Sequence, residues 1–562
     1  MPPAVDYPLR TGPAEPLGRR GAVCLALLVL LTFLPRLAVA LRLGPVCDDG
    51  YFYLAVADAY ERGDLETALW YLNINVYPVL LAGFSQLGLD PLSAAKTWGV
   101  TVATLTVLPL FGWLRRLLDF RSAVAACGLY AVHPEFIEIS PEPIRDATFW
   151  LFAALSLYLF WRAAAERKLW IFLLAGLSFA LAAHTRSEGW LFALPAAAWP
   201  IVHWGEAVRA RWKLVVGTIV AFSMTPLLVV GLNVTVLQHH SHWEWGKLEH
   251  FSLPYHLIAG SDAQGARDAA PAVQPHSIAA VDTVPRTIPK SGLNRVAPAL
   301  IAELQKNVPN EESGISTYFR SAVHALEPVT LLLMLFGVIA GRRLLLRREH
   351  LVLSAMCASI VLGVWVRQAM LGEINGRYFL ACFFPASGAA GLGAIWVLSK
   401  MEQGWAARLS HSRAAIATAT VAILIGSAHV AEVMAGEHPS REREAKFGRL
   451  LGEQLGRNRT MIVLPHASRV GYYAGGRLPV VALDDTPIES LLARHGAEIV
   501  ILEHGYTPAS RCADLACRLI AQGWTPLGLA NVPESEPFLV LVGPSTPLAS
   551  AAPLRKESAG VR

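Results

Sequence analysis

The sequence predicts a mainly α-helical, polytopic membrane protein of about 11 spans, with a small extracytoplasmic α/β domain near its C-terminus. Composition predicts the membrane part, because 54% of the 562 residues are hydrophobic and only 16% are charged, against roughly 25% in soluble globular proteins. The mean hydropathy of +0.41 agrees with this class. Strand-like and helical segments alternate after about residue 437, which predicts the α/β domain.

The spans are predicted from apolar runs that are long enough, or nearly long enough, to cross a bilayer. Their odd number puts the two termini on opposite sides of the membrane. The runs cover about 21–41, 93–114, 122–138, 146–161, 169–183, 189–204, 214–237, 326–341, 350–366, 378–399 and 414–434.

Lysine and arginine residues in the short loops predict the orientation, because cytoplasmic loops carry an excess of them. Alternate short loops hold nineteen such residues on one side and four on the other. We therefore expect a plasma (inner) membrane protein with residues 1–20 in the cytoplasm and the C-terminal domain outside. These loops also account for the net charge of +5, so no nucleic-acid partner is inferred. The four outer residues are Arg145, Arg186, Arg367 and Arg377.

The first run permits a second interpretation, because Arg19 and Arg20, the apolar stretch and residues 38–40 also fit a cleaved signal peptide. Cleavage would leave the acidic residues that follow almost at a free N-terminus, where they could not be held rigidly. We therefore favour a retained anchor helix as the start of a transmembrane domain over 21–434.

Two outer loops of this domain, 42–92 and 238–325, are too long to be simple connectors. The first contains short apolar stretches at 52–60 and 77–87, which we expect to lie at the interface as amphipathic helices. The second is rich in proline and alanine near 262–290, and an amphipathic helix is predicted over 293–307. Its length suits a segment that closes over a site.

The α/β domain is predicted over 437–543, followed by a disordered tail over 544–562. It lacks a glycine-rich phosphate motif, so nucleotide binding is not indicated. A disulfide between Cys512 and Cys517 requires that they not share one regular helix, on which this spacing separates them too far. A charged helical pattern covers 440–457, and strands are predicted at 460–465, 478–483, 498–503 and 537–543.

Ionisable residues at the outer ends of the spans are the main candidates for a functional site, because charge at membrane depth is costly. Asp48 and Asp49 directly follow the first span. Two adjacent carboxylates repel each other, which raises the pKa of one of them and suits a general base. The pair also suits a site for sugar hydroxyls or a divalent cation, and the alternative is a solvated loop start.

A second acidic cluster, HPEFIEISPEPIRD over 133–146, lies at the outer turn between the third and fourth spans. Glu142, Arg145 and Asp146 are its candidate substrate-binding residues. The same segment also fits an ordinary helix start, since Pro143 and acidic side chains are favoured there.

Arginines at two further outer turns predict an anion site. Arg186 precedes Glu188 in HTRSEGW, and Arg377 precedes Tyr378 in NGRYF. A guanidinium matches two oxygens of a phosphate, so we expect these four residues to line a substrate site. The alternative for each arginine is an ion pair with its local glutamate.

The second long loop opens with His239, His240, His242 and Lys247. Histidines at these spacings could bind a metal, but the tryptophans between them favour an interfacial aromatic belt with solvated histidines. Lys247 is kept as a candidate substrate-binding residue. No cofactor is expected, with a divalent cation as the alternative.

The order of these motifs resembles the C-type membrane glycosyltransferases, specifically the protein O-mannosyltransferase and aminoarabinose-transferase group. The resemblance covers about residues 20–400, with a looser match in the tail. It rests on the acidic pair followed by YFYLAVADAYERGD, NVYPVLLAGFSQLG, HPEFIEISPEPIRD, HTRSEGW, NGRYFLACFFP and YYAGGRLPVV, in this order.

The resemblance implies an inverting transferase that takes a sugar from a polyprenyl phosphate to an extracytoplasmic hydroxyl of a glycan, lipid or protein. The family's acidic motif falls on Asp48 and Asp49. It usually has glutamate at the second position, so which carboxylate is the base stays open. The family's outer arginines correspond to Arg186 and Arg377, and no counterpart of a metal site is found.

The residues support this chemistry independently, because a carboxylate can accept the acceptor's proton and arginines can stabilise a departing phosphate. Two other classes remain as alternatives. A secondary transporter would show internal repeats and polar groups at the midplane, and the sequence has no such repeat. A non-catalytic membrane assembly protein would leave the outer acidic and arginine clusters without a role.

Overall fold

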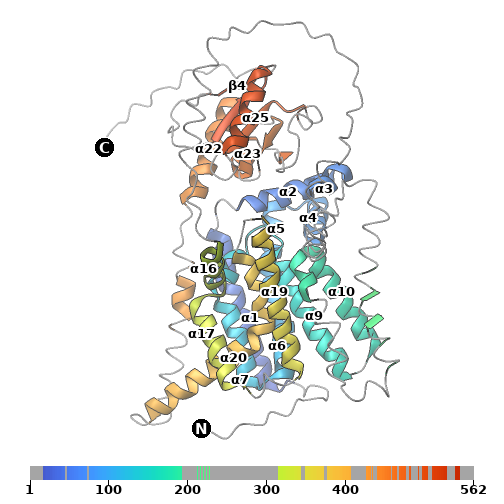
Figure 1. Cartoon of the computed structure of the whole chain (residues 1–562), viewed down its shortest axis with the longest axis vertical. Coiled ribbons are helices and arrows are strands. Elements are labelled where there is room, and N and C mark those ends of the chain that lie inside the picture. The colour runs from blue at the N-terminus through green and yellow to red at the C-terminus, as the bar shows by residue number, and fades with distance from the viewer. Residues whose placement is uncertain are drawn as a thin grey trace, which may run out of the picture.

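The protein is described by a computed structural model of the whole chain (Figure 1). The parts of the chain that it describes are 17–42, 47–71, 75–166, 168–192, 314–342, 348–371, 376–406, 439–456, 459–464, 467–475, 480–481, 496–503, 509–527 and 538–544, with isolated positions between them.

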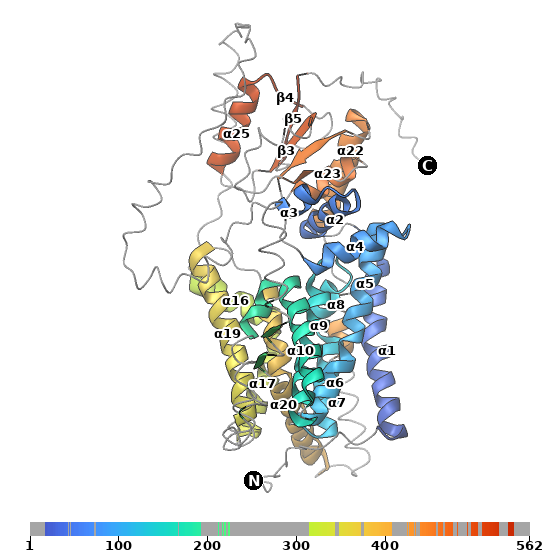
Figure 2. The same cartoon turned by 90° about the vertical axis from the view of Figure 1, so that its right-hand side faces the viewer.

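Long apolar helices form one bundle (Figures 1 and 2). Within the described residues, five segments are long and apolar enough to cross a membrane: Arg19–Arg42, Pro91–Leu117, Asp146–Glu166, His350–Arg367 and Gly376–Gly404. The pair Ser316–Leu326 and Pro328–Ala340, bent by 86°, is apolar enough to be either one broken span or a re-entrant loop. The sequence predicts about eleven, but much of the predicted runs 189–204, 214–237 and 414–434 lies outside the described residues.

Two further predicted runs are helical but shorter than a full span, namely Phe120–Val132 and Leu169–Thr185. Two helices of the bundle, α5 (Pro91–Leu105) and α7 (Phe120–Val132), begin at an aspartate that caps them. Asp90 accepts a hydrogen bond from the Ser93 N–H at 2.8 Å, and Asp119 accepts one from the Ser122 N–H at 3.0 Å.

The bundle consists of α1 (Arg19–Arg42), α5 (Pro91–Leu105), α6 (Val107–Leu117), α7 (Phe120–Val132), α8 (Pro134–Ile139), α9 (Asp146–Glu166), α10 (Leu169–Thr185), η1 (Ser187–Phe192), α16 (Gly314–Leu326), α17 (Pro328–Ala340), α19 (Arg348–Leu371), η3 (Gly376–Phe379) and α20 (Leu380–Ala406).

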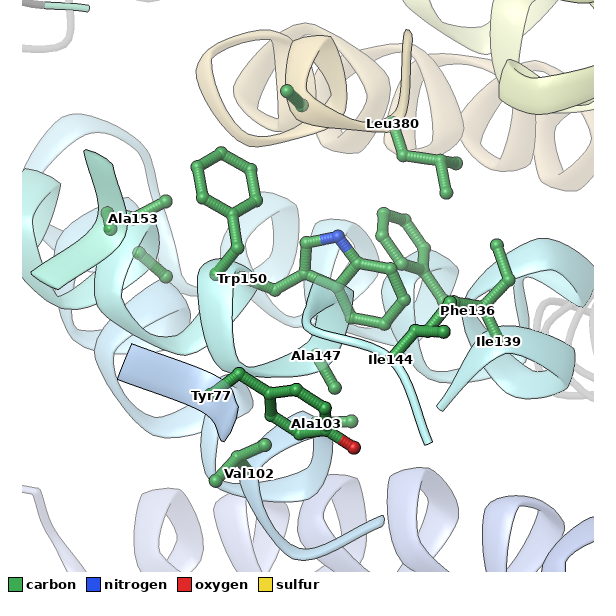
Figure 3. Close-up of a cluster of buried hydrophobic side chains, with 14 of the residues drawn as sticks. Tyr77, Val102, Ala103, Phe136, Ile139, Ile144, Ala147, Trp150, Ala153 and Leu380 are labelled. Carbon is green, nitrogen blue, oxygen red and sulfur yellow. The ribbon is translucent and has the colours of Figure 1, made fainter. Parts of the chain in front are cut away.

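Aromatic side chains fill the bundle between α5, α8, α9 and α20 (Figure 3). The rings of Phe136 and Trp150 meet edge to face with centroids 4.7 Å apart, and the ring of Phe383 lies 5.1 Å from that of Phe136. Such edge-to-face pairs add to the stabilisation from burial alone. This cluster lies directly below the turn that carries the second acidic cluster of the sequence.

Arg36 fixes the same turn from inside the bundle. It is fully buried, and its guanidinium donates to Ser140 Oγ at 3.1 Å and to the carbonyls of Thr32, Ala131 and Tyr130 at 2.8 to 3.1 Å. A buried charge is tolerated when its donors are satisfied. Arg36 therefore joins α1 to the α7–α8 corner and so positions the segment that leads into α9.

Three short helices lie across one end of the bundle: α2 (Asp48–Glu61), α3 (Leu65–Tyr71) and α4 (Val76–Gln86) (Figure 2). The structure thus has helices at both apolar stretches, 52–60 and 77–87, that the sequence singles out. The charge bias of the loops predicts this end to be extracytoplasmic, and it is called the outer end below.

Beyond the outer end lies a five-stranded mixed sheet with the strand order β2-β1-β3-β5-β4. Strand β1 pairs parallel with β2 and β3, whereas β5 pairs antiparallel with β3 and β4. The C-terminal sheet unit comprises α22 (Pro439–Leu455), β1 (Met461–Val463), α23 (Ser468–Gly475), β2 (Val480–Val481), β3 (Ile499–Glu503), α25 (Ala509–Ala521), β4 (Thr525–Pro526) and β5 (Phe538–Val542).

Four of these strands fall on the strand-like segments of the sequence, and β4 is additional. Positions 512 and 517 both lie in α25, the arrangement in which the sequence argues against a disulfide between them. The predicted helix over 293–307 and the tails over 1–16 and 545–562 lie outside the described residues.

Candidate active site

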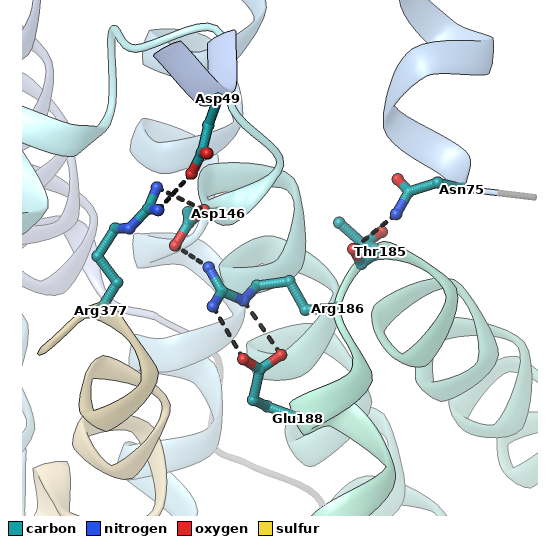
Figure 4. Close-up of polar contacts among 7 residues, drawn as sticks. All are labelled: Asp49, Asn75, Asp146, Thr185, Arg186, Glu188 and Arg377. Carbon is teal, nitrogen blue, oxygen red and sulfur yellow. Dashed lines mark hydrogen bonds and ion pairs between the residues drawn. The ribbon is translucent and has the colours of Figure 1, made fainter. Parts of the chain in front are cut away.

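Ionisable side chains from separate segments meet at the outer end of the bundle (Figure 4). Asp49 lies in the first turn of α2, and Asp146 is the first residue of α9. Arg186 ends α10, Glu188 follows it in η1, and Arg377 lies in η3 at the start of α20. Each side chain therefore stands at a helix end, where the chain leaves the apolar bundle.

These residues form an alternating row of acids and bases. Arg377 pairs with Asp49 and lies 4.0 Å from Oδ2 of Asp146. The other carboxylate oxygen of Asp146 pairs with Arg186. Arg186 in turn holds Glu188 through two hydrogen bonds of 2.9 and 3.3 Å. Each guanidinium thus lies between two carboxylates.

Burial makes this row rigid and strongly coupled. The side chain of Arg186 is 5% exposed and that of Asp146 is 3% exposed. Burial alone would raise the pKa of Glu188, but Arg186 outweighs it and lowers that pKa to about 2. Burial would lower the pKa of Arg186, but Asp146 and Glu188 raise it well above its usual value. Arg186 and Glu188 are therefore charged at neutral pH.

Asp49 stands at the open end of the row, with its side chain 53% exposed. Burial of the carboxyl raises its pKa, but Arg377 lowers it more, with help from Arg145 and Arg186, so the net shift is downward. Asp49 is thus ionised and accessible.

Two further arginines lie beside the row. The guanidinium of Arg145 lies 5.5 Å from the ring centroid of Tyr53, and that of Arg367 lies 4.8 Å from the ring centroid of Tyr378. Arg186 faces the same Tyr378 ring at 5.2 Å. These are cation–π distances.

Within the described parts of the chain, neither Arg145 nor Arg367 forms an ion pair with a carboxylate. The described cluster therefore holds four guanidinium groups against the three carboxylates of Asp49, Asp146 and Glu188. The excess of positive charge suits an anionic ligand.

Asn75 supports the site from the first outer loop. Its side-chain amide donates to the Thr185 carbonyl at 2.9 Å (Figure 4). Its side-chain oxygen accepts the Tyr77 N–H at 3.0 Å. The start of α4 is thereby fixed to the end of α10, directly beside Arg186.

Glu142 has a different environment from the one that the sequence suggests. It is 3% exposed, accepts the Cys47 backbone N–H at 3.0 Å and pairs with Arg441 of the sheet unit. Both carboxylate oxygens are thus occupied by protein groups. These contacts favour a structural role and do not fit the substrate-binding role predicted from the sequence.

The structure brings together most of the residues that the sequence marks: Asp49, Arg145, Asp146, Arg186, Glu188, Arg377 and Tyr378. Asp48 is the first residue of α2, but its side chain lies outside the described residues, as does Lys247. Arg367, Tyr53 and Arg441 were missed. The sequence contained an indication for Arg367, because it is one of the four arginines in the outer loops. The sequence contained no such indication for Arg441, because it lies in a helix with many other charged residues.

Groups of three or more His, Cys, Asp or Glu with a metal-binding arrangement are not found in the described residues. The predicted histidine cluster at 239–242 lies outside them.

Comparison with known proteins shows which family and which folds the chain resembles. Residues 76–229 match the family of dolichyl-phosphate-mannose-protein mannosyltransferases. Two solved structures share the fold over 92% of this chain at 13% identity. The predicted resemblance to the C-type membrane glycosyltransferases is confirmed. No curated protein matches the sequence.

The first of these structures is the oligosaccharyltransferase AglB of Archaeoglobus fulgidus, in complex with an inhibitory peptide and a dolichol-phosphate. The likeness covers 75% of that chain with a TM-score of 0.53. The second is ArnT of Cupriavidus metallidurans bound to undecaprenyl phosphate, covered to 97% with a TM-score of 0.54. At this identity the likeness establishes a common fold.

Proposed function

We propose that the protein is an inverting membrane glycosyltransferase that moves a sugar from a polyprenyl phosphate to a hydroxyl group on the outer side of the membrane. The observation that carries this proposal is the row Asp49–Arg377–Asp146–Arg186–Glu188, with an excess of arginine beside it. Its place at the outer end of a fold shared with two polyprenyl-phosphate-bound proteins supports a lipid-linked donor.

The reaction is a single displacement at the anomeric carbon. The acceptor oxygen forms a bond to that carbon, and the bond between the carbon and the phosphate oxygen breaks. The acceptor's proton passes to a carboxylate of the Asp48–Asp49 pair, and the lipid phosphate leaves with the bonding electrons. Asp49 is the favoured base because it is accessible and ionised.

The ion pairs change the roles proposed for the arginines. Arg186 and Arg377 are each engaged by two carboxylates, so we assign them to the orientation of Asp146 and Asp49. Arg145 and Arg367 are better placed to bind the donor phosphate, because neither pairs with a carboxylate among the described residues and each lies beside an aromatic ring.

The acidic pair is tested by single replacement of Asp48 and Asp49 by Asn in the full-length protein. A strain that lacks the protein should accumulate its lipid-linked sugar, and mass spectrometry of the extracted lipids identifies that sugar by its mass. We expect one Asn variant to lose on the order of 10²–10⁴-fold in turnover and to restore this accumulation. Asp58→Asn is the matched control, because Asp58 lies on the same helix and pairs with Arg62 one turn further along the chain. Normal consumption of the lipid-linked sugar by both Asp48 and Asp49 variants contradicts the proposal.

The arginine assignment is tested by binding of undecaprenyl phosphate to the purified protein. We expect Arg145→Gln and Arg367→Gln each to weaken binding by about tenfold, the size of one lost charge-assisted hydrogen bond. Arg62→Gln, at the exposed arginine that follows the end of α2, should leave the affinity unchanged. Equal affinity in all variants removes the phosphate role of Arg145 and Arg367.

A further inference from the structure

The C-terminal sheet unit contacts the helix that carries the acidic pair at two points. The first is the buried carboxylate of Glu142, which accepts the Cys47 N–H with one oxygen and pairs with Arg441 through the other. Cys47 is the N-cap of α2, and its own side chain makes no capping hydrogen bond. Glu142 therefore supplies the negative charge that favours a helix N-terminus.

The second contact is aromatic. Tyr51, two residues after Asp49, is 1% exposed. Its ring centroid lies 4.5 Å from that of Tyr472 and 6.1 Å from that of Tyr473, both on α23. This contact fixes α2 at Tyr51, in its first turn, whereas Glu142 fixes the helix at its N-cap residue, Cys47.

Both contacts come from one rigid element. Helices α22 and α23 pack so closely that a Cβ at Gly448 would lie 2.5 Å from the Val470 carbonyl oxygen, and one at Gly452 would lie 2.4 Å from that of Ala474. Arg469 on α23 also pairs with Glu444 on α22. Arg441 on α22 and Tyr472 on α23 therefore cannot shift independently.

We infer that Glu142 and Arg441 are positioning residues, through which the C-terminal sheet unit fixes the N-terminus of α2 and hence the place of Asp49. The inference rests on the proposed function only for its catalytic consequence. The sheet unit then contributes to the reaction by holding α2, whereas Arg145 and Arg367, which are assigned to the donor phosphate, lie in the helical bundle.

The catalytic consequence is tested with Glu142→Gln, Arg441→Met and the double variant in membranes. We expect each to consume the lipid-linked sugar about tenfold or more slowly, because a small displacement of a reacting group is costly. Binding of undecaprenyl phosphate should change less than about twofold. The double variant should lose no more than either single variant, because the two residues act through one contact.

Arg459→Met is the matched control, since Arg459 forms a 2.9 Å ion pair with Glu498 within the same sheet unit. It should retain wild-type turnover, and Arg441→Lys should recover part of the loss. A parallel loss of undecaprenyl phosphate affinity in Glu142→Gln, or additive losses in the double variant, overturns the positioning role.

Cys47 provides a readout that does not depend on activity. Burial raises the pKa of its thiol, Glu142 and Asp49 raise it further, and Arg377 and Arg441 lower it. Removal of Arg441 therefore raises the thiol pKa and slows maleimide labelling by itself. Site-resolved mass spectrometry measures this labelling, and faster labelling of Cys47 in Arg441→Met therefore reports greater access to the start of α2 despite the higher thiol pKa.

We expect that increase in Arg441→Met and not in Arg459→Met. Unchanged or slower labelling of Cys47 in Arg441→Met overturns the inference. If labelling rises but the strain without the protein accumulates no lipid-linked sugar, the positioning of α2 stands and the proposed transferase function fails.

Discussion

Asp49 illustrates how a single residue acquires its properties from partners distant in sequence. Arg377, 328 positions away, pairs with its carboxylate and keeps its pKa below the usual value, although burial of the carboxyl would raise it. A low pKa keeps Asp49 ionised, so it can accept a proton over the whole neutral range. A carboxylate with a lower pKa is also a weaker proton acceptor. The ion pair with Arg377 therefore orients Asp49 but reduces its basicity.

This balance predicts a pH shift. Proton acceptance by Asp49 is present above its lowered pKa and is lost as the pH falls through it. In Arg377→Gln the effect of burial is no longer opposed by that arginine, so the pKa rises and the acid limb of turnover moves toward neutral pH. The rate of lipid-linked sugar consumption between about pH 4 and pH 8 checks this, with Arg62→Gln as the control. An acid limb that stays in place in Arg377→Gln contradicts the role of Asp49 as the base.

At the scale of elements, α20 is the helix that carries η3, and therefore Arg377, into the site. It packs against its neighbours through glycines. A Cβ at Gly393 would lie 1.8 Å from the Leu333 carbonyl oxygen of α17, and one at Gly391 would lie 2.3 Å from the Ser122 carbonyl oxygen of α7. Small residues allow such close approach in membrane helices, where van der Waals packing drives association.

Replacement of Gly393 by Val should therefore push α17 and α20 apart. We expect a loss of about 1–3 kcal/mol in stability, as for other overpacked contacts, and a lower midpoint of thermal unfolding in detergent. Gly128→Ala on α7 is the control, because a Cβ there meets nothing within 4 Å. Equal midpoints of thermal unfolding for the two variants would show that the close α17–α20 contact does not contribute to stability.

At the scale of the whole molecule, α2, the helix that carries Asp49, lies between the helical bundle and the sheet unit (Figures 1 and 2). The helices α2 to α4 form the layer between them. The ion pair of Glu142 with Arg441 crosses this layer and joins residues 299 positions apart. A donor whose lipid stays in the bilayer and whose phosphate reaches the surface suits this arrangement.

The orientation of the molecule is a prediction from the loop charges. We expect alkaline phosphatase fused after residue 544 to be active, because it folds only outside the cytoplasm, and green fluorescent protein fused before residue 17 to fluoresce. The reverse pair of results would place the site on the cytoplasmic side, where a nucleotide-linked donor would be within reach.

Much of the site was visible in the sequence, because charge at the end of an apolar run is a local property. The excess of arginine in the cytoplasmic loops left four outer exceptions, and all of them, Arg145, Arg186, Arg367 and Arg377, lie in the cluster of the structure. The sequence also placed Asp49, Asp146 and Glu188 at outer turns.

The partners of these residues could not be read in the same way. The sequence offered Glu188 as the local partner of Arg186, and the structure adds Asp146 from another helix. For Glu142 the sequence predicted substrate binding. In the structure its carboxylate instead contacts Cys47 and Arg441.

Hydropathy and loop charge by themselves determined that this is a helical membrane protein, where its apolar helices run and which ionisable residues stand at their ends. Only the tertiary structure decided which arginines are neutralised, which remain available to an anion and which acid supports another helix. The reason is physical: insertion into a bilayer depends on the composition of one segment at a time, whereas an ion pair depends on how the ends of separate helices pack together.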